Sequence, residues 1–210
     1  MHQLLFQDRD LDIFRKGDYQ PINNDFISEA NYAIAPLIDV QNRYKKLDND
    51  SFFNELKDGM VASYLGFDLV NTKKHGLDAK NSLNNTYLEV KQASFTTSTW
   101  GGTFNDTTYE KAEAFKDKKL FLAVALWAGI SELQFIVYGQ NPAIGEYLKD
   151  KVDYFKSGGS VRSTQSISVK DLVNKYGFYI ISPTKSKKDV QSIFRLKYRG
   201  DDWWSDAIIE

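Results

Sequence analysis

The sequence predicts a mixed α/β or α+β protein in which one mixed central sheet is flanked by helices. Some segments repeat apolar residues every three to four positions, which is typical of amphipathic helices. Other short segments are apolar throughout or alternate apolar and polar residues, which is typical of strands. These segments follow one another as helix, three strands, helix, two strands and helix, and this order favours a sheet covered by helices.

The length of 210 residues suits one domain with a sizeable core. We expect a single domain over residues 1–210, with its core at about 50–155. A helical segment over 22–48 should precede that core, and an extension over 156–210 should follow it.

Composition excludes several classes of protein. The chain has no cysteine, which rules out disulfides, thiolate metal sites and a cysteine nucleophile, and makes the cytoplasm the expected compartment. The first residues do not resemble a signal peptide, and the most apolar stretch, at 120–130, is too short to span a bilayer, so no membrane partner is expected. The net charge of −1 means that any surface for nucleic acid must be local.

Two helices are expected in the first third of the chain. Apolar spacing predicts the first over 24–47, where Pro36 should kink or split it. The second is predicted over 50–65, because Asp50 or Ser51 can cap its start and a glycine follows its last apolar position.

Three strands should follow. Residues 67–71 are short and apolar, and residues 75–80 and 86–93 should form a hairpin because the intervening NSLNN is rich in turn residues. A polar loop with two glycines is then expected over 95–106.

The second half continues the alternation of helices and strands. Thr107 and Glu110 have the spacing of a capping box and should begin a helix over 107–118. A buried strand over 119–129 should pair antiparallel with 133–139, and Pro142 should begin the next helix. The remaining expected elements are a loop at 157–166, a helix at 168–177, a strand at 178–182 and a basic loop at 183–191.

The predicted strand over 86–93 places an acid and a base on one face. Side chains alternate along a strand, so Glu89 and Lys91 point one way while Leu88 and Val90 point the other. If residues 75–80 pair antiparallel with this strand, Asp78 can reach the same face. Asp78 could instead be a turn residue, and the strand face could carry only a weak solvated ion pair.

Two carboxylates this close repel each other unless a cation lies between them. Magnesium suits such a pair because it prefers oxygen ligands and keeps several waters. The backbone carbonyl of Val90 could add one more oxygen, and Lys91 beside the metal could position or help to deprotonate an attacking water.

Asp78 followed by Glu89-Val90-Lys91 resembles the D…ExK signature of the PD-(D/E)XK nuclease superfamily. The core of that superfamily is a helix, a three-strand meander with its catalytic residues on the second and third strands, a further helix and another strand. Residues 51–139 are predicted to follow this order. The upstream helix of the family often supplies an extra acid, and Glu55 is the candidate. Within the superfamily the chain looks most like type II restriction endonucleases.

The resemblance implies a restriction-endonuclease-like fold and a site-specific endonuclease that cleaves double-stranded DNA with Mg²⁺, for which Mn²⁺ could substitute. Asp78 and Glu89, with the Val90 carbonyl, would hold the metal. Lys91 would activate the water, and Glu55 could support it. A palindromic site is met by a two-fold protein, so the resemblance also implies a homodimer. A structure-selective or repair nuclease and a non-catalytic DNA-binding module of the same fold remain the alternatives.

Polar and basic residues near this site are the candidates for DNA contact. The residues at 73–75 could simply belong to an exposed loop. The residues at 105–107 could contact base edges, or they could simply shape a turn or cap a helix. Two glycines, Gly101 and Gly102, would let the backbone approach a groove closely. The candidates are Lys73, Lys74, His75, Gln92, Ser94, Thr103, Asn105, Asp106, Thr107, Lys111, Arg162 and Gln165.

Overall fold

The computed structural model describes residues 52–70, 77–128, 132–158 and 164–209, together with six helical positions between residues 32 and 43. The chain divides into two compact units, 1–52 and 53–210. In the first unit the described helical positions lie within the helix predicted over 24–47, and Arg43 pairs with Asp39 at 3.1 Å. The rest of that predicted helix, and the caps proposed at Asp50 and Ser51, lie outside the described residues.

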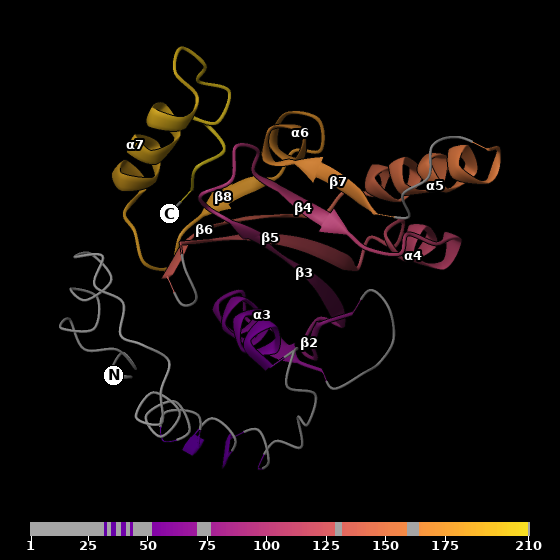
Figure 1. Cartoon of the computed structure of the whole chain (residues 1–210), viewed down its shortest axis with the longest axis horizontal. Coiled ribbons are helices and arrows are strands. Elements are labelled where there is room, and N and C mark those ends of the chain that lie inside the picture. The colour runs from indigo at the N-terminus through magenta and orange to yellow at the C-terminus, as the bar shows by residue number, and fades with distance from the viewer. Residues whose placement is uncertain are drawn as a thin grey trace, which may run out of the picture. The chain divides into compact units, whose positions relative to one another are not determined.

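The second unit is built on a six-stranded mixed sheet, which confirms the predicted class (Figure 1). The strand order is β1-β2-β3-β5-β6-β8. All neighbouring pairs are antiparallel except β3 and β5, which are parallel. The strands are β1 Asp68–Leu69, β2 Ala79–Asn81, β3 Thr86–Ser94, β5 Leu120–Ala128, β6 Glu132–Gly139 and β8 Tyr179–Ile181.

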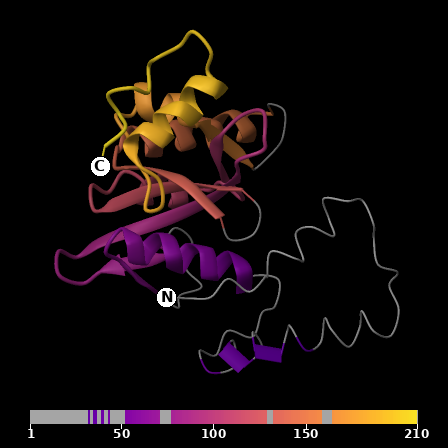
Figure 2. The same cartoon turned by 90° about the vertical axis from the view of Figure 1, so that its left-hand side faces the viewer.

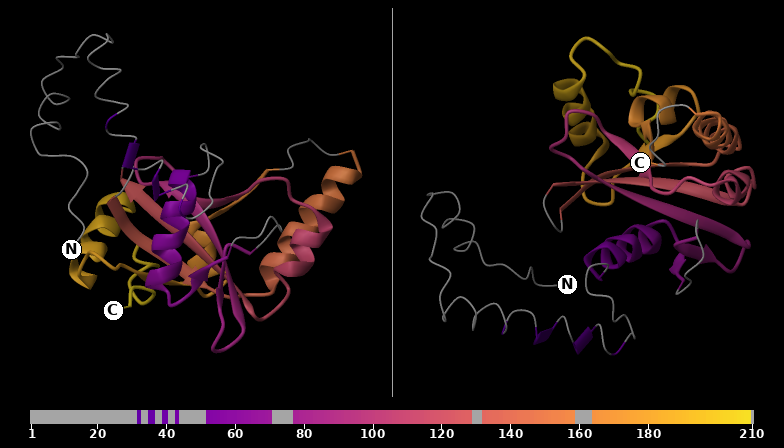
Figure 3. Two further views of the ribbon diagram at one scale, coloured as in Figure 1. Left: turned by 90° about the horizontal axis from the view of Figure 1, so that it is seen from below. Right: turned by 45° about the vertical axis from the view of Figure 1, so that its right-hand side comes forward.

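Helices cover both faces of the sheet. One face carries α3 (Phe52–Tyr64), and the other carries α4 (Tyr109–Ala114), α5 (Ala143–Lys156), α6 (Val169–Asn174) and α7 (Lys187–Lys197) (Figure 2). The right-hand view of Figure 3 shows the same two-sided cover. As predicted, Gly66 follows α3 with a φ of +78°, and Pro142 is the N-cap of α5. None of the described helices has the length and apolar character that crossing a membrane requires.

The central strand β5 explains the two hydrophobic cores. Its side chains alternate, so Leu122, Val124 and Leu126 enter the larger core under α4 to α7. Ala123 and Ala125 enter the smaller core under α3. A strand covered on both faces becomes apolar throughout, which is why the sequence of β5 shows no alternation.

A second, two-stranded sheet corrects two predicted loops. The predicted loop at 95–106 contains β4 (Gly101–Phe104), and the predicted loop at 157–166 runs into β7 (Gln165–Ser168). The two strands pair antiparallel with Thr103 opposite Ser166. Gly102, Phe104 and Ile167 are buried, whereas Thr103 and Ser166 are exposed. Four-residue strands with paired glycines are too short and too weakly patterned to be recognised from local sequence.

The glycines of β4 allow close packing within the molecule, and their approach to DNA stays a prediction. A Cβ on Gly101 would lie 2.5 Å from the Ile167 carbonyl oxygen. On Gly102 it would lie 2.8 Å from Val124 Cγ2 and 3.4 Å from Lys91 Cβ. The β4–β7 ribbon therefore rests directly on the strand that carries Lys91.

We expect Gly101→Ala to lower the melting temperature, because its methyl group meets backbone that cannot move away without separating β4 from β7. Overpacking of this kind costs about 1–3 kcal/mol. The control is Gly59→Ala in α3, where the nearest atom is an ordinary 3.8 Å away and helix propensity favours alanine. Thermal melts of the two variants check the prediction, and equal melting temperatures would contradict it.

The C-terminal residues belong to the body of this unit. The predicted basic loop at 183–191 instead contains the start of α7, which Ser186 and Asp189 cap reciprocally in a capping box. Val190 and Phe194, four residues apart, bury one face of α7. Trp204 is buried, and Ile208 bridges to Ile180 of β8.

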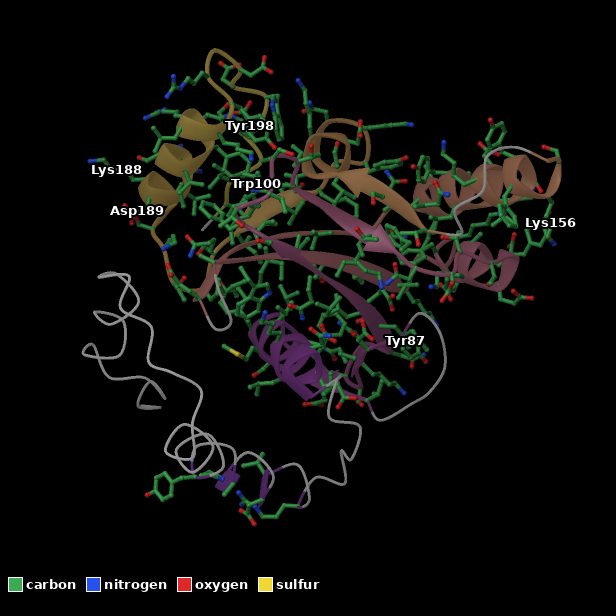
Figure 4. The ribbon with its side chains drawn as sticks, in the orientation of Figure 1. Tyr87, Trp100, Lys156, Lys188, Asp189 and Tyr198 are labelled. Carbon is green, nitrogen blue, oxygen red and sulfur yellow. The ribbon has the colours of Figure 1, made fainter. Side chains whose placement is uncertain are left out.

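The larger core therefore extends well beyond residue 155. Trp100, which follows β3 by six residues, packs edge-on against Phe194. It packs edge-on against Tyr198 as well (Figure 4). Lys197 of α7 lies over the Trp100 ring and donates to the Thr97 carbonyl at 2.7 Å. The segment leaving β3 is thus held by the C-terminal helix.

Candidate active site

The structure brings Asp78, Glu89 and Lys91 together. Asp78 directly precedes β2, and its amide donates to the Leu88 carbonyl at 2.9 Å. Its Oδ2 accepts from the Val90 amide at 2.7 Å. These two bonds hold the Asp78 carboxylate against β3 beside Glu89 and give it more than the role of a turn residue.

Glu89 is a buried acid. Only 4% of its surface is exposed, and its Oε1 accepts from Lys91 Nζ. Tyr87 and Ala93 on the same strand face pack against the larger core, so this face is not the solvated surface that an ordinary surface ion pair would occupy. Glu89 Oε2 is buried without a hydrogen-bond partner among the described residues. A buried carboxylate oxygen left unpaired is costly, and a bound cation would remove that cost.

Burial and crowding raise the pKa of Asp78. Desolvation is the largest cause, the Glu89 charge adds to it, and the Val90 amide opposes it, leaving the pKa at about 6. Two carboxylates held this close form a site in which positive charge is favoured.

Asp58 of α3 is an acid of the site that was not predicted from the sequence. Its Oδ1 accepts from Gln92 Nε2 at 2.5 Å. Its pKa is raised to about 7, chiefly by burial and also by the charge of Asp78, while the Gln92 hydrogen bond opposes the shift. Asp58 lies three residues after the predicted Glu55, which places both on one side of the helix. This spacing in the sequence could have identified Asp58 as a second acid on the same side of the helix.

The two α3 acids differ in their surroundings. The charge on Asp58 interacts with Asp78, Glu89 and Lys91, which ties it to the acid pair. Glu55 is partly buried one turn earlier, and a role for it stays a prediction. Because side chains alternate along β3, Gln92 points to the α3 face while Lys91 points to the other. Asp58 therefore approaches the site from the opposite face of the sheet.

The Val90 carbonyl is oriented toward Asp78. A strand residue directs its N–H and C=O to the same edge, and the Val90 amide points at Asp78. Pairing between β2 and β3 reaches only Leu88, so β2 supplies no ladder partner beyond that residue. The carbonyl can therefore join the two carboxylates as a third oxygen ligand.

This donor set fits a hard divalent cation. Over the ranges that the structure describes, no three His, Cys, Asp or Glu side chains form a metal-binding group. Two carboxylates, Asp78 and Glu89, with one carbonyl are nevertheless the small protein contribution typical of Mg²⁺, which retains several waters. Asp78 and Glu89 differ from an ordinary acid pair because Glu89 Oε2 is buried without a partner.

The predicted DNA contacts are distributed unevenly. Lys73, Lys74, His75 and Arg162 lie outside the described residues. The Gln92 amide donates to Asp58 and to the Asn54 carbonyl and so supports the acid cluster, while its contact with DNA stays a prediction. Ser94 is exposed at the end of β3, where its hydroxyl meets that of Thr96 at 2.9 Å.

The structure also joins the candidate Thr103 to a residue far away in the sequence. The hydroxyls of Thr103 and Ser166, which are 63 residues apart, lie 3.3 Å from each other on the exposed face of the β4–β7 ribbon. Gln165 is therefore a strand residue opposite Phe104 and not part of a loop.

The turn between β4 and α4 differs from its prediction. The N-cap of α4 is Thr108, which accepts from the Lys111 amide, and not Thr107. Thr107 instead donates to the Phe104 carbonyl. Asn105 and Asp106 are exposed, and Asp106 has a φ of +47°, which Asp tolerates better than most residues.

Comparison of the chain with models of known protein families and with curated proteins gave no match. The geometry of the site and the topology that positions it are therefore the basis for inferring its function.

Proposed function

We propose that this chain is a magnesium-dependent endonuclease that hydrolyses phosphodiester bonds in double-stranded DNA. The observation that carries the proposal is the acid pair Asp78 and Glu89 beside Lys91, with one buried Glu89 oxygen that has no hydrogen-bond partner in the described part of the chain. A hard cation completes this arrangement, and a phosphodiester is the anionic substrate that such a cation with a lysine recognises.

The topology supports membership of the PD-(D/E)XK nuclease superfamily. The helix α3 is followed by the meander β1-β2-β3, by α4 and then by β5, which lies parallel to β3. Asp78 adjoins the second strand of the meander, and Glu89 and Lys91 lie on the third. A restriction-endonuclease-like fold and a type II, site-specific homodimer are the finer forms of the proposal.

The side chains divide the chemistry as follows. Asp78, Glu89 and the Val90 carbonyl would hold Mg²⁺, which supplies charge neutralisation and lowers the pKa of a bound water. Once Glu89 is engaged there, the ammonium of Lys91 can turn to the attacking water or to a phosphate oxygen. The water oxygen bonds to phosphorus, its proton leaves to solvent or a basic group, and the departing ester oxygen gains a proton.

Cleavage should require a divalent cation. Digestion of phage DNA should proceed with Mg²⁺ or Mn²⁺ and stop with excess chelator, whereas Ca²⁺ should support DNA binding with little cutting. Gel electrophoresis of the products is the measurement. Full activity in chelator would contradict the proposed site.

The same digest separates the alternatives. Discrete bands indicate a site-specific restriction enzyme, and a smear or structure-dependent cutting indicates a repair-type nuclease of the superfamily. Binding in Ca²⁺ without any cleavage in Mg²⁺ or Mn²⁺ indicates a DNA-binding module that lacks catalysis.

A further inference from the structure

A second lysine is buried beside the proposed site. Lys111 of α4 is 7% exposed, and among the described residues only Glu89 and Gln134 share its status as buried polar or charged groups. Its Nζ donates to the Asn105 carbonyl at 2.5 Å. Lys91 Nζ lies 5.7 Å from the ring centroid of Phe104, the residue before Asn105, so the two lysines approach the same turn. The charges of Lys91, Glu89, Asp106 and Asp78 all act on Lys111.

The two lysines have different partners. Lys91 is ion-paired with Glu89, whereas the ion pairs found within the described ranges include none for Lys111. Among the described residues, the hydrogen-bond partner of the Lys111 ammonium is therefore a neutral carbonyl, while the charges of Glu89, Asp106 and Asp78 act on it from nearby. Burial and the nearby Lys91 both lower its pKa.

Stability alone does not account for a cation at this position. Burying an ammonium costs free energy, and a second ammonium nearby adds repulsion. The neighbouring Ala112 and Phe115 are apolar and fully buried, so an apolar side chain would suit this part of α4. Cations kept at such a cost are concentrated at functional sites.

We propose that Lys111 is a second cationic residue of the active site and binds the phosphate group under attack. This inference rests on the nuclease function proposed above. A divalent cation and the carboxylates of Asp78 and Glu89 balance each other in charge, and Lys91 supplies one positive charge for the attacking water or a phosphate oxygen. The additional negative charge that develops on the phosphate oxygens in the transition state is then met by Lys111.

The test uses Lys111→Gln, which keeps an N–H donor for the Asn105 carbonyl and removes the charge. Binding of a mixed-sequence DNA duplex is measured in Ca²⁺ over a series of salt concentrations. Losing one phosphate contact should reduce the slope of log affinity against log salt by about 1. Cleavage in Mg²⁺ should fall roughly 100-fold, as when one preorganised donor to a developing oxyanion is removed.

Two further variants isolate the charge. Lys116→Met removes a lysine just beyond α4 whose ammonium contacts Glu113 at 2.7 Å and Glu146 at 3.2 Å, so its loss should change neither slope nor rate. Lys111→Arg keeps the charge and should restore most of the slope lost in Lys111→Gln. Lys111→Met replaces the glutamine variant if that variant melts below the assay temperature.

The outcomes distinguish this inference from the function on which it depends. If the wild type binds and cuts DNA while Lys111→Gln keeps the wild-type slope and rate, Lys111 is only a structural residue and the inference is overturned. A lowered melting temperature with an unchanged slope overturns it as well. If the wild type neither binds nor cuts DNA, the nuclease function fails and the inference falls with it.

Discussion

Glu89→Gln should abolish DNA cleavage, with a fall in rate on the order of a thousandfold or more. Glutamine keeps the shape of the side chain and an acceptor for Lys91, but it lacks the charge that would hold a divalent cation. Glu89 is buried, and its Oε2 has no hydrogen-bond partner among the described residues. Burying a neutral amide there should therefore cost no more free energy than burying the carboxylate. We therefore expect a melting temperature at or above that of the wild type.

Lys91→Ala should lose cleavage to a similar degree while the fold is retained. The matched control is Glu113→Gln, which neutralises an exposed acid of α4 that pairs with Lys116 at the surface. That variant should cut DNA at the wild-type rate. Near-normal cleavage by either Glu89→Gln or Lys91→Ala would exclude the assigned roles.

Divalent cations should stabilise the folded chain, and more strongly at pH 8 than at pH 5. The pKa of Asp58 is raised to about 7 and that of Asp78 to about 6, against 3.8 in the unfolded chain. Between about pH 4 and 7 the folded state therefore binds more protons than the unfolded state, and stability without cation falls as pH rises through that window. A cation competes with these protons for the carboxylates and should therefore bind best above about pH 7.

The size of the effect follows from linkage. A cation at a hundred times its dissociation constant adds about 2.7 kcal/mol to the free energy of unfolding. For a chain of this length that corresponds to roughly 5–10 °C in melting temperature. Calorimetry or thermal melts with Ca²⁺, which should not support cutting, measure this shift apart from activity.

Asp78→Asn provides the control for the cation shift. Its amide oxygen can still accept from the Val90 amide, but the charge is gone. The variant should be more stable than the wild type at pH 8 without cation and should show little shift with Ca²⁺. An equal Ca²⁺ shift at both pH values, or in Asp78→Asn, would mean that the ion binds elsewhere.

The elements that the sequence predicted correctly are those with a strong local pattern. The apolar run of β5 and its antiparallel neighbour β6 were recognisable because they lie next to each other in the chain. Pro142 marked the start of α5, and Ser168 caps α6 inside its predicted range. The D…ExK spacing selected Asp78, Glu89 and Lys91, because pairing across a short turn and alternation along a strand are themselves local rules.

Only the tertiary structure decided which further groups surround that spacing. The β4–β7 ribbon joins segments more than sixty residues apart, and no local periodicity encodes such pairing. Asp58 reaches the acids because α3 packs on the face to which Gln92 points, and Lys111 is buried because α4 packs against the sheet beside Lys91. Side-chain types and spacings are written in the chain, whereas burial and the desolvation that shifts a pKa arise only when distant elements exclude water together.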